Sequence, residues 1–252
     1  MIKISAVSSC SDPGNVASEN QDTIYCSPED KYWLLADGIG GTKGGKLASE
    51  LAISSMSERL SNESIQEASS RTQQLINARQ EQQPEHCEMG TTIAVAKVAK
   101  YGFEVAWLGD SRIYNYSKNN QSLQLLSRDH SVVQDRLDRG ELTPNQAMNH
   151  PERNLINRFL GMKSTANEIE VRQFKPTRNG ILFLCSDGVT DYVSEHTIQS
   201  ILSSTDDLRL CRQKLQQSVL TTEAQDNFSF ILISYEISIA TKLQNIASKS
   251  HK

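Results

Sequence analysis

The segment TIAVAKVAKYGFEVAWLGDSRIYNY, residues 92–116, holds three short runs rich in β-branched and aromatic residues. The runs cover residues 92–98, 103–108 and 113–116, and the connections between them are too short to contain a helix. Parallel strands need a crossover of about a dozen or more residues, whereas antiparallel neighbours can be joined by a tight turn. The segment therefore predicts an antiparallel sheet and argues against a doubly wound βαβ fold.

Other parts of the chain predict further strands and helices. Runs of the same composition predict strands at residues 2–7, 32–36, 181–185 and 228–234. Helical spacing of small and apolar residues predicts two helices, one with the stripe Leu47, Ala48, Leu51, Ala52 and Ser55, the other with Ile65, Ala68, Leu75 and Ile76. The second stripe overlaps a glutamine-rich stretch, residues 66–83, which we interpret as a solvent-facing helix side. Residues 130–160 predict a helix, a turn and a helix, with Pro144 at a helix start and Pro151 as a breaker.

The length of the chain favours one domain and also allows two. The chain has 252 residues, and we predict a single domain over residues 1–240 with a fraying tail at 241–252. Lys plus Arg total 26 and Asp plus Glu total 30, so the net charge of −4 argues against a nucleic-acid partner. The cysteines, 5 in number, form no CxxC pair, which favours a reduced cytoplasmic compartment. The sequence shows neither a leader peptide nor a long apolar run, so we expect no membrane segment.

Three apolar runs end in an aspartate. Asp37 follows WLLA, Asp110 follows VAWLG and Asp187 follows LFLCS. A single Asp-Gly pair usually marks a turn, but a turn does not require an apolar run before the acid. A carboxylate at the edge of a core needs a positive partner, and apart from Arg112 no basic residue follows the same pattern. A divalent cation is the simplest partner, and oxygen ligands favour magnesium or manganese over zinc.

Two more acids could complete such a site. Asp22 precedes a short strand-like run, and Asp226 immediately precedes the run at 228–234. Together the acids are numerous enough for two ions about 4 Å apart that activate a bridging water. Gly38 would let a backbone carbonyl turn inward as a further ligand. The glycines that follow could cradle a phosphate, but they lack the order of a P-loop, so we set nucleotide binding aside.

The chain resembles the metal-dependent protein phosphatases of the PP2C type, the PPM family, and in style their compact bacterial members. The resemblance rests on motifs in family order: NQD at 20–22, LLADGIGGTKGGKLAS at 34–49, MGTT at 89–92, LGDSRIY at 108–114, RDHS at 128–131, HPERNLINRFLG at 150–161, LFLCSDGVTD at 182–191 and DNFSFILI at 226–233. It implies an α+β fold, an α/β/β/α sandwich of two packed antiparallel sheets flanked by helices. It also implies a dinuclear Mn²⁺ or Mg²⁺ site at one end of the sandwich.

The resemblance implies a role for each acid. Asp37 would bridge both ions, Gly38 would offer its carbonyl to one of them, and Asp22 would bind or hold water on the same ion. Asp187 and Asp226 would bind the other ion, and Asp110 with Asp187 would hold a third, weaker ion. Residues 132–160 correspond to a flap beside the site, which contains His150 and Arg153.

The reaction implied by the resemblance is hydrolysis of phosphoserine or phosphothreonine. Water activated by the metals would attack phosphorus directly, so Asp37 and Asp187 would be catalytic through that water and no phosphoenzyme would form. Cys185, which ends an apolar run, is then expected to be a core residue rather than a nucleophile. The expected partners are phosphorylated proteins made by a serine/threonine kinase, and the protein is expected to be a monomer.

Two positions depart from the family pattern. Ala17 stands where the family usually has an arginine that grips the substrate phosphate, and Lys43, Lys46 or Arg153 could replace that grip. Ile39 stands where some members have a histidine that protonates the leaving group, so water on a metal is the expected acid, with His130 and His150 as weaker candidates. A pseudophosphatase that binds phosphoproteins without turnover and a hydrolase of small phosphoesters remain as alternatives.

Overall fold

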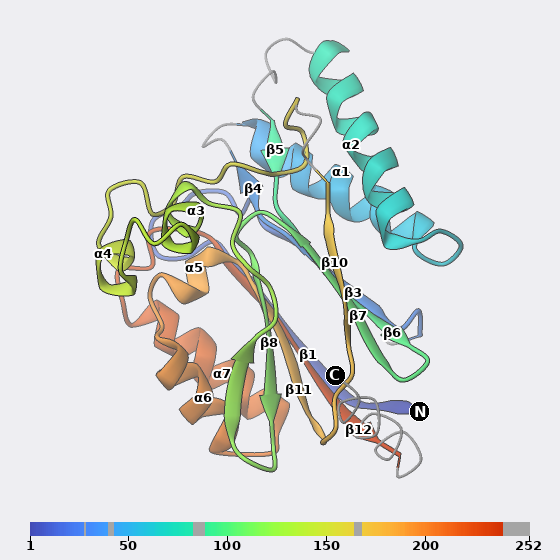
Figure 1. Cartoon of the computed structure of the whole chain (residues 1–252), viewed down its shortest axis with the longest axis vertical. Coiled ribbons are helices and arrows are strands. Elements are labelled where there is room, and N and C mark those ends of the chain that lie inside the picture. The colour runs from blue at the N-terminus through green and yellow to red at the C-terminus, as the bar shows by residue number, and fades with distance from the viewer. Residues whose placement is uncertain (28, 40–42, 83–88, 164–167, 239–252) are drawn as a thin grey trace.

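The computed structural model describes residues 1–27, 29–39, 43–82, 89–163 and 168–238 as two sheets with helices on both outer sides (Figure 1). The first five-stranded sheet has the order β1-β12-β11-β8-β9, and the second has the order β10-β7-β6-β3-β2. Every neighbouring pair in both sheets is antiparallel. The sandwich expected from the resemblance is confirmed.

The bounds of the elements are as follows. The first sheet contains β1 (Ile2–Asp12), β8 (Arg112–Ser117), β9 (Ser122–Leu125), β11 (Gly180–Cys185) and β12 (Phe228–Ile237). The second contains β2 (Thr23–Ser27), β3 (Tyr32–Ala36), β6 (Ile93–Ala99), β7 (Gly102–Leu108) and β10 (Glu170–Phe174), and β4 (Gly38–Ile39) pairs separately with β5 (Gly90–Thr91). The helices are α1 (Lys43–Arg59), α2 (Ile65–Gln82), α3 (Val132–Asp138), α4 (Pro144–Met148), α5 (Asp187–Thr190), α6 (Glu195–Ser203) and α7 (Leu208–Leu220).

Three apolar layers hold the sandwich together. In β3, Trp33 and Leu35 face the layer between the sheets, whereas Leu34 and Ala36 face α1 and α2. In β11 the alternation is the same, and Phe183 faces α6 and α7. Strands buried on both faces carry continuous apolar runs, which explains why these strands could be predicted from the sequence. Cys185 lies in the layer beneath α6 and α7, as expected.

The helix predicted in the glutamine-rich stretch is α2, but two of its glutamines point inward. Gln80 is 6% exposed, and its Nε2 donates to Met89 O at 2.6 Å and to Gly161 O at 3.1 Å. Gln73 Nε2 donates to Met162 O at 2.9 Å, and Gly161 N donates to Gln73 Oε1 at 2.9 Å. The interpretation of a purely solvent-facing side is therefore wrong at these two positions, which bind the end of the flap to α2.

Residues 130–160 contain α3 and α4, and Pro144 begins α4 as predicted. Thr143 caps α4, and its backbone and side chain exchange hydrogen bonds with Gln146. The predicted tail at 241–252 lies outside the described residues. Within the described ranges, no helix is both long and apolar enough to span a membrane.

Candidate active site

The five predicted acids lie at strand ends that meet at one edge of the sandwich. Asp37 follows β3 and Asp22 precedes β2, and because these strands are antiparallel, both acids lie at the same end of the second sheet. Asp110 follows β7, which runs parallel to β3 because β6 lies antiparallel between them. In the first sheet, Asp187 follows β11 and Asp226 precedes its antiparallel neighbour β12. The fold thus gathers residues that are up to two hundred positions apart in the sequence.

Two carboxylate oxygens at this edge are buried without a hydrogen-bond partner. Asp22 is 7% exposed, and Ser186 Oγ donates to its Oδ2 at 2.9 Å, but its Oδ1 receives no hydrogen bond. Asp187 is half-buried, and its Oδ1 is also unpartnered. A buried carboxylate oxygen without a partner lowers the stability of the fold, so a cation bound by these two atoms would be stabilising.

The acids also raise one another's pKa values. Burial raises the pKa of Asp37 well above its usual range, and the charges of Asp22 and Asp187 add to the effect. Burial likewise raises the pKa of Asp187, with Asp110 as the next cause. Burial raises the pKa of Asp22 to about 6 against the hydrogen bonds of Ser229 and Ser186. Neighbouring carboxylates that raise one another's pKa values are typical of a site that binds cations.

Arg112, the basic residue nearest to Asp110 in the sequence, forms an ion pair with Asp129 instead. Arg112 Nε donates to Asp129 Oδ1 at 3.0 Å, and Arg112 Nη2 donates to Asp129 Oδ2 at 2.6 Å. Its pairing with Asp129 explains why the basic residue after Asp110 does not neutralise that acid. Burial and the charge of Asp129 together raise the pKa of Asp110 to about 7, although the charge of Arg112 opposes the rise.

The residues present fit a site for hard divalent ions. In the described part of the chain, no three His, Cys, Asp or Glu side chains are already drawn tightly enough together to enclose an ion. Magnesium and manganese complete their shells with water and carbonyl oxygens, so a few carboxylates with unsatisfied oxygens suffice. The two orphaned oxygens of Asp22 and Asp187 are such donors.

The backbone around Asp37 is fixed by the MGTT motif. Asp37 N donates to Thr92 Oγ1 at 3.0 Å, and Asp37 O accepts from Thr92 N at 2.8 Å and from Thr91 Oγ1 at 2.8 Å. The next residue must be glycine, because a Cβ on Gly38 would lie 2.8 Å from Gln21 O and still closer to Gly45 O. This crowding positions Asp37 and leaves room only for backbone at Gly38.

Asn227 and Ser186 are positioning residues that the sequence analysis did not identify. Asn227 Oδ1 accepts from Gln21 N at 2.8 Å, and its Nδ2 donates to Pro13 O and Glu19 O, both at 3.0 Å. Asn227 therefore holds the loop that leads to Asp22. Ser186 accepts a hydrogen bond from Ser229 N at 2.9 Å while it donates to Asp22. Ser186 precedes Asp187 and Asn227 follows Asp226, so each lies next to a predicted metal ligand within a family motif. That position in the motif was the only indication of their role in the sequence.

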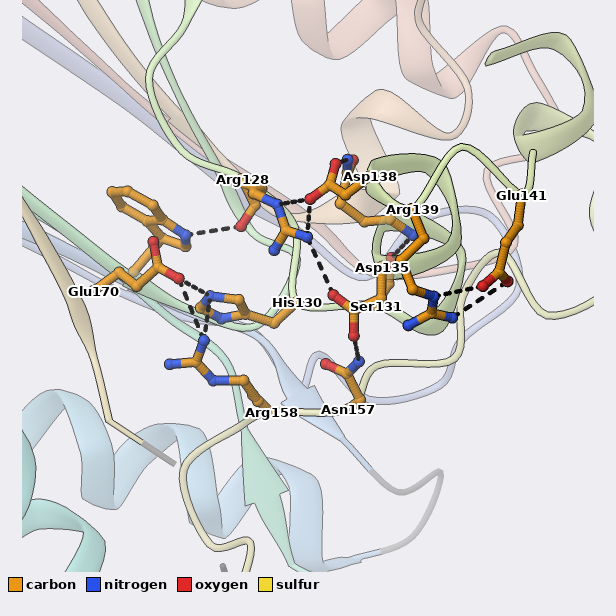
Figure 2. A network of polar contacts seen from close by, with 12 residues as sticks. Arg128, His130, Ser131, Asp135, Asp138, Arg139, Glu141, Asn157, Arg158 and Glu170 are labelled. Atoms are coloured by element: carbon orange, nitrogen blue, oxygen red, sulfur yellow. Dashed lines mark hydrogen bonds and ion pairs between the residues drawn. The ribbon is translucent and has the colours of Figure 1, made fainter. Parts of the chain in front are cut away.

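The RDHS motif anchors the base of the flap (Figure 2). Arg128 contacts Asp135 at 3.1 Å and also pairs with Asp138, which ties it to α3. Asp135 in turn accepts from Asn157 Nδ2 at 2.7 Å. Ser131 caps α3, since its side chain accepts from Gln134 N at 3.2 Å. The two ends of the flap are thus bound to each other and to the sheet.

His130 connects the flap to the loop that carries Asp110. His130 N donates to Gly109 O at 3.0 Å, and Gly109 N donates to His130 Nδ1 at 3.1 Å. Because Nδ1 accepts, Nε2 carries the proton and donates to Glu170 Oε1 at 2.9 Å. Burial lowers the pKa of His130, although the hydrogen bond to Glu170 opposes this. His150 is engaged inside the flap by Arg136, whose Nη1 lies 3.1 Å from His150 Nε2.

A cleft of about 620 Å³ extends from the acids to the flap. Asp110 and Asp187 line one end, and α3 and α4 contribute apolar side chains, among them Leu137 and Met148. Arg153 lines the cleft as well, with Nη2 3.5 Å from Asp191 Oδ2. Arg153 therefore lines the same cleft as Asp110 and Asp187.

The other two candidates for the phosphate grip are placed less directly. Lys46 in α1 pairs with Glu19 at 3.3 Å on a partly exposed surface and does not line the cleft. The side chain of Lys43 lies outside the described residues, as do Gly40 and Gly41. Ala17 is half-buried in the loop that Asn227 holds.

Comparisons with known proteins agree with this geometry. The family model described as Protein phosphatase 2C matches residues 15–223. The serine/threonine phosphatase stp of Listeria welshimeri is 30% identical over 236 residues, which cover 88% of this chain and 92% of that protein. The serine/threonine protein phosphatase PstP of Mycobacterium tuberculosis is 33% identical over 201 residues, which cover 76% of this chain and 38% of that protein.

Solved structures give the same result. The crystal structure of the Mycobacterium tuberculosis phosphatase PstP/Ppp has a TM-score of 0.82 and 28% identity, and the match covers 93% of this chain and 99% of that one. A structure of the PstP catalytic domain in complex with 2 manganese ions has a TM-score of 0.79 and 26% identity, and covers 93% of this chain and 98% of that one. The fold, the acids at one sheet edge and the family match lead to one conclusion: this chain belongs to the protein phosphatase 2C family.

Proposed function

We propose that this chain is a metal-dependent protein phosphatase that hydrolyses phosphoserine and phosphothreonine in proteins. The observation that carries the proposal is the cluster of Asp22, Asp37, Asp110, Asp187 and Asp226 at one sheet edge, with two buried oxygens that lack a partner. The names of the relatives support the activity, since stp and PstP are both called serine/threonine phosphatases.

The cluster would hold two Mn²⁺ or Mg²⁺ ions. Asp37 interacts with both Asp22 and Asp187. It would bridge the ions, with Asp22 and the Gly38 carbonyl on one side and Asp187 and Asp226 on the other. Asp110 with Asp187 would hold a third, weaker ion. The pair of manganese ions in the related PstP structure supports the count of two. When bound, the ions would neutralise phosphate oxygens and lower the pKa of the attacking water.

The chain itself orients the substrate and the acids. Thr91 and Thr92 hold the Asp37 backbone, and Ser186 holds one oxygen of Asp22. Arg153 lies in the cleft and would bind the phosphate in place of the arginine that Ala17 replaces, with Lys43 and Lys46 as the other candidates. This role requires Arg153 to exchange its contact with Asp191 for the phosphate.

None of the three positions considered as the acid for the leaving group supplies a free acidic side chain. His130 is held by Gly109 and Glu170, His150 is held by Arg136, and Ile39 has no titratable group. We therefore propose that the departing alkoxide takes its proton from water. Cys185 is fully buried, and burial raises its pKa, so the thiol is not a nucleophile.

The proposal extends to partners and location. The substrates would be phosphoproteins made by a serine/threonine kinase, and the enzyme would act as a monomer in the cytoplasm. The described cysteines Cys10, Cys26, Cys185 and Cys211 are all free thiols, which supports a reducing compartment. The intact set of acids favours turnover over the pseudophosphatase alternative.

Metal-dependent phosphate release tests the proposal. The purified protein is stripped with a chelator and assayed on a phosphothreonine peptide and on p-nitrophenyl phosphate, with and without Mn²⁺. We expect release only with Mn²⁺, retained activity in Asp206→Asn, and lost activity in a folded Asp187→Asn variant. Release from the small ester alone would favour the phosphoester hydrolase, and no release from either substrate would reject the enzyme.

A further inference from the structure

A second cavity, of about 410 Å³, lies at the end of the sandwich away from the flap. It lies between the β8–β9 hairpin and the connection from β10 to β11, and Figure 1 shows both far from α3 and α4. β8 separates it from the acids, since Arg112 begins the strand beside Asp129 and Ser117 ends it at the cavity. At about 3.3 Å per residue the strand spans roughly 17 Å, so the cavity is separate from the active site.

The inner face of β8 turns polar at this cavity. Ile113 packs in the layer between the sheets, whereas Tyr114 and Tyr116 pack beneath α6 and α7. By alternation, Asn115 and Ser117 face the space between the sheets. Their cross-strand partners are Gln124 and Ser122. Asn115 and Ser117 thus place polar side chains at the end of the layer between the sheets, beside Ser122 and the exposed Gln124 of the edge strand β9.

Asn115 carries an unused donor that faces the cavity. Its side chain is 8% exposed, and its Oδ1 accepts from Tyr235 Oη at 2.6 Å. Among the described residues, nothing accepts a hydrogen bond from Asn115 Nδ2, and the residue lines the cavity. The Asn115 amide nitrogen is thus available to donate a hydrogen bond to water or to a ligand in the cavity.

The charged lining of the cavity is only positive. Lys175 and Arg178 line it, and no described carboxylate does. None of the ion pairs between described residues involves either cation, although the whole chain carries a net charge of −4. Asn119, Asn120 and Thr177 add further neutral hydrogen-bonding groups.

We infer that this cavity binds a small phosphate-bearing molecule. The guanidinium of Arg178 and the ammonium of Lys175 suit phosphate oxygens, and Asn115 Nδ2 supplies a fixed donor inside the cavity. The volume is within the range of small-molecule sites, and the polar lining favours a hydroxyl-bearing phosphate ester or pyrophosphate over an aromatic ligand. This inference does not rest on the proposed phosphatase activity.

Calorimetric titration without divalent metal tests the inference. Pyrophosphate and glucose 6-phosphate are titrated into the full chain in the presence of a chelator, because the metal-free acid cluster then repels anions from the active site. We expect saturable binding of at least one probe at one site per chain. The double variant Lys175→Gln, Arg178→Gln should weaken that binding by roughly tenfold or more. Asn115→Asp, which keeps the size but removes the donor and adds a negative charge, should abolish it.

A charge-matched control separates the site from general attraction. The double variant Lys163→Gln, Arg71→Gln removes the same charge from exposed cations that pair with Glu81 and Glu63. It should bind as the wild type does. The inference is overturned if neither probe binds, if the Lys175 and Arg178 variant binds as the wild type does, or if the control loses as much affinity. Melting curves check the folding of each variant, and if Asn115→Asp unfolds, the two exposed cations decide the outcome.

Discussion

Replacing Gln80 by methionine tests how the flap is joined to the backbone of Asp37. Gln80 Nε2 donates to Met89 O and to Gly161 O. Both acceptors belong to segments that lead to Thr91, which contacts Asp37. Gly161 follows Leu160, which pairs with Thr91, and Thr91 Oγ1 donates to Asp37 O at 2.8 Å. Loss of the Gln80 contacts should therefore affect both stability and the metal site.

The loss of unfolding free energy in Gln80→Met can be estimated from the hydrogen bonds and carbonyl groups affected. Two lost hydrogen bonds and two buried carbonyls without these donors cost about 2–4 kcal/mol. The change also removes Gln80 Oε1, which is buried without a partner, and this recovers about 1 kcal/mol. We expect a net loss of about 1–3 kcal/mol in the free energy of unfolding, or a fall in melting temperature of about 2–12 °C. The manganese concentration for half-maximal activity should rise.

Gln74→Met is the matched control, because Gln74 lies on the exposed side of the same helix. Urea unfolding and manganese titration of activity are measured for both variants and the wild type. Equal unfolding free energies for Gln80→Met and Gln74→Met would refute the structural role. A large loss of stability with an unchanged manganese requirement would refute the link to Asp37.

Three further variants test individual residues. Gly38→Ala places a Cβ 2.8 Å from Gln21 O, so we expect manganese-dependent activity to fall by more than roughly tenfold. Unchanged kinetics would show that the backbone can shift to accommodate the methyl group. Arg153→Gln should raise the KM for a phosphopeptide more than Lys46→Gln does, since only Arg153 lines the cleft, and the opposite order would move the phosphate grip to α1. Burial lowers the pKa of His130 below its ordinary 6.5, so its neutral form stabilises the fold above that pH and this contribution is lost as the pH falls through the lowered value. The stability advantage of the wild type over His130→Asn should therefore shrink between about pH 7.5 and about pH 5.5 in urea titrations, and a constant difference would contradict the assignment.

The acids could be predicted from sequence because each follows or precedes a short strand. Asp37 and Asp187 directly follow strands buried on both faces, and such strands carry continuous apolar runs that a reader can find without a structure. The antiparallel order followed from the short connections in residues 92–116. The acids converge because the strand ends that carry them all lie at the same end of the sandwich.

Contacts between distant segments could not be predicted in this way. The pairing of Arg112 with Asp129 and the inward turn of Gln80 depend on which backbone passes nearby in the fold. The half-exposed edge strand β10 has no clear apolar alternation, so it was not predicted. Helices α6 and α7 were also not predicted, although their buried residues, such as Ile198, Ile201 and Leu202 in α6, recur at helical spacing within polar surroundings.

Anomalous diffraction from crystals soaked in Mn²⁺ would locate the metal ions relative to the acids. We expect two manganese peaks about 4 Å apart, both in contact with Asp37, with Asp22 on one side and Asp187 and Asp226 on the other. Peaks that do not contact Asp37, or a single ion bound away from these acids, would contradict this expectation.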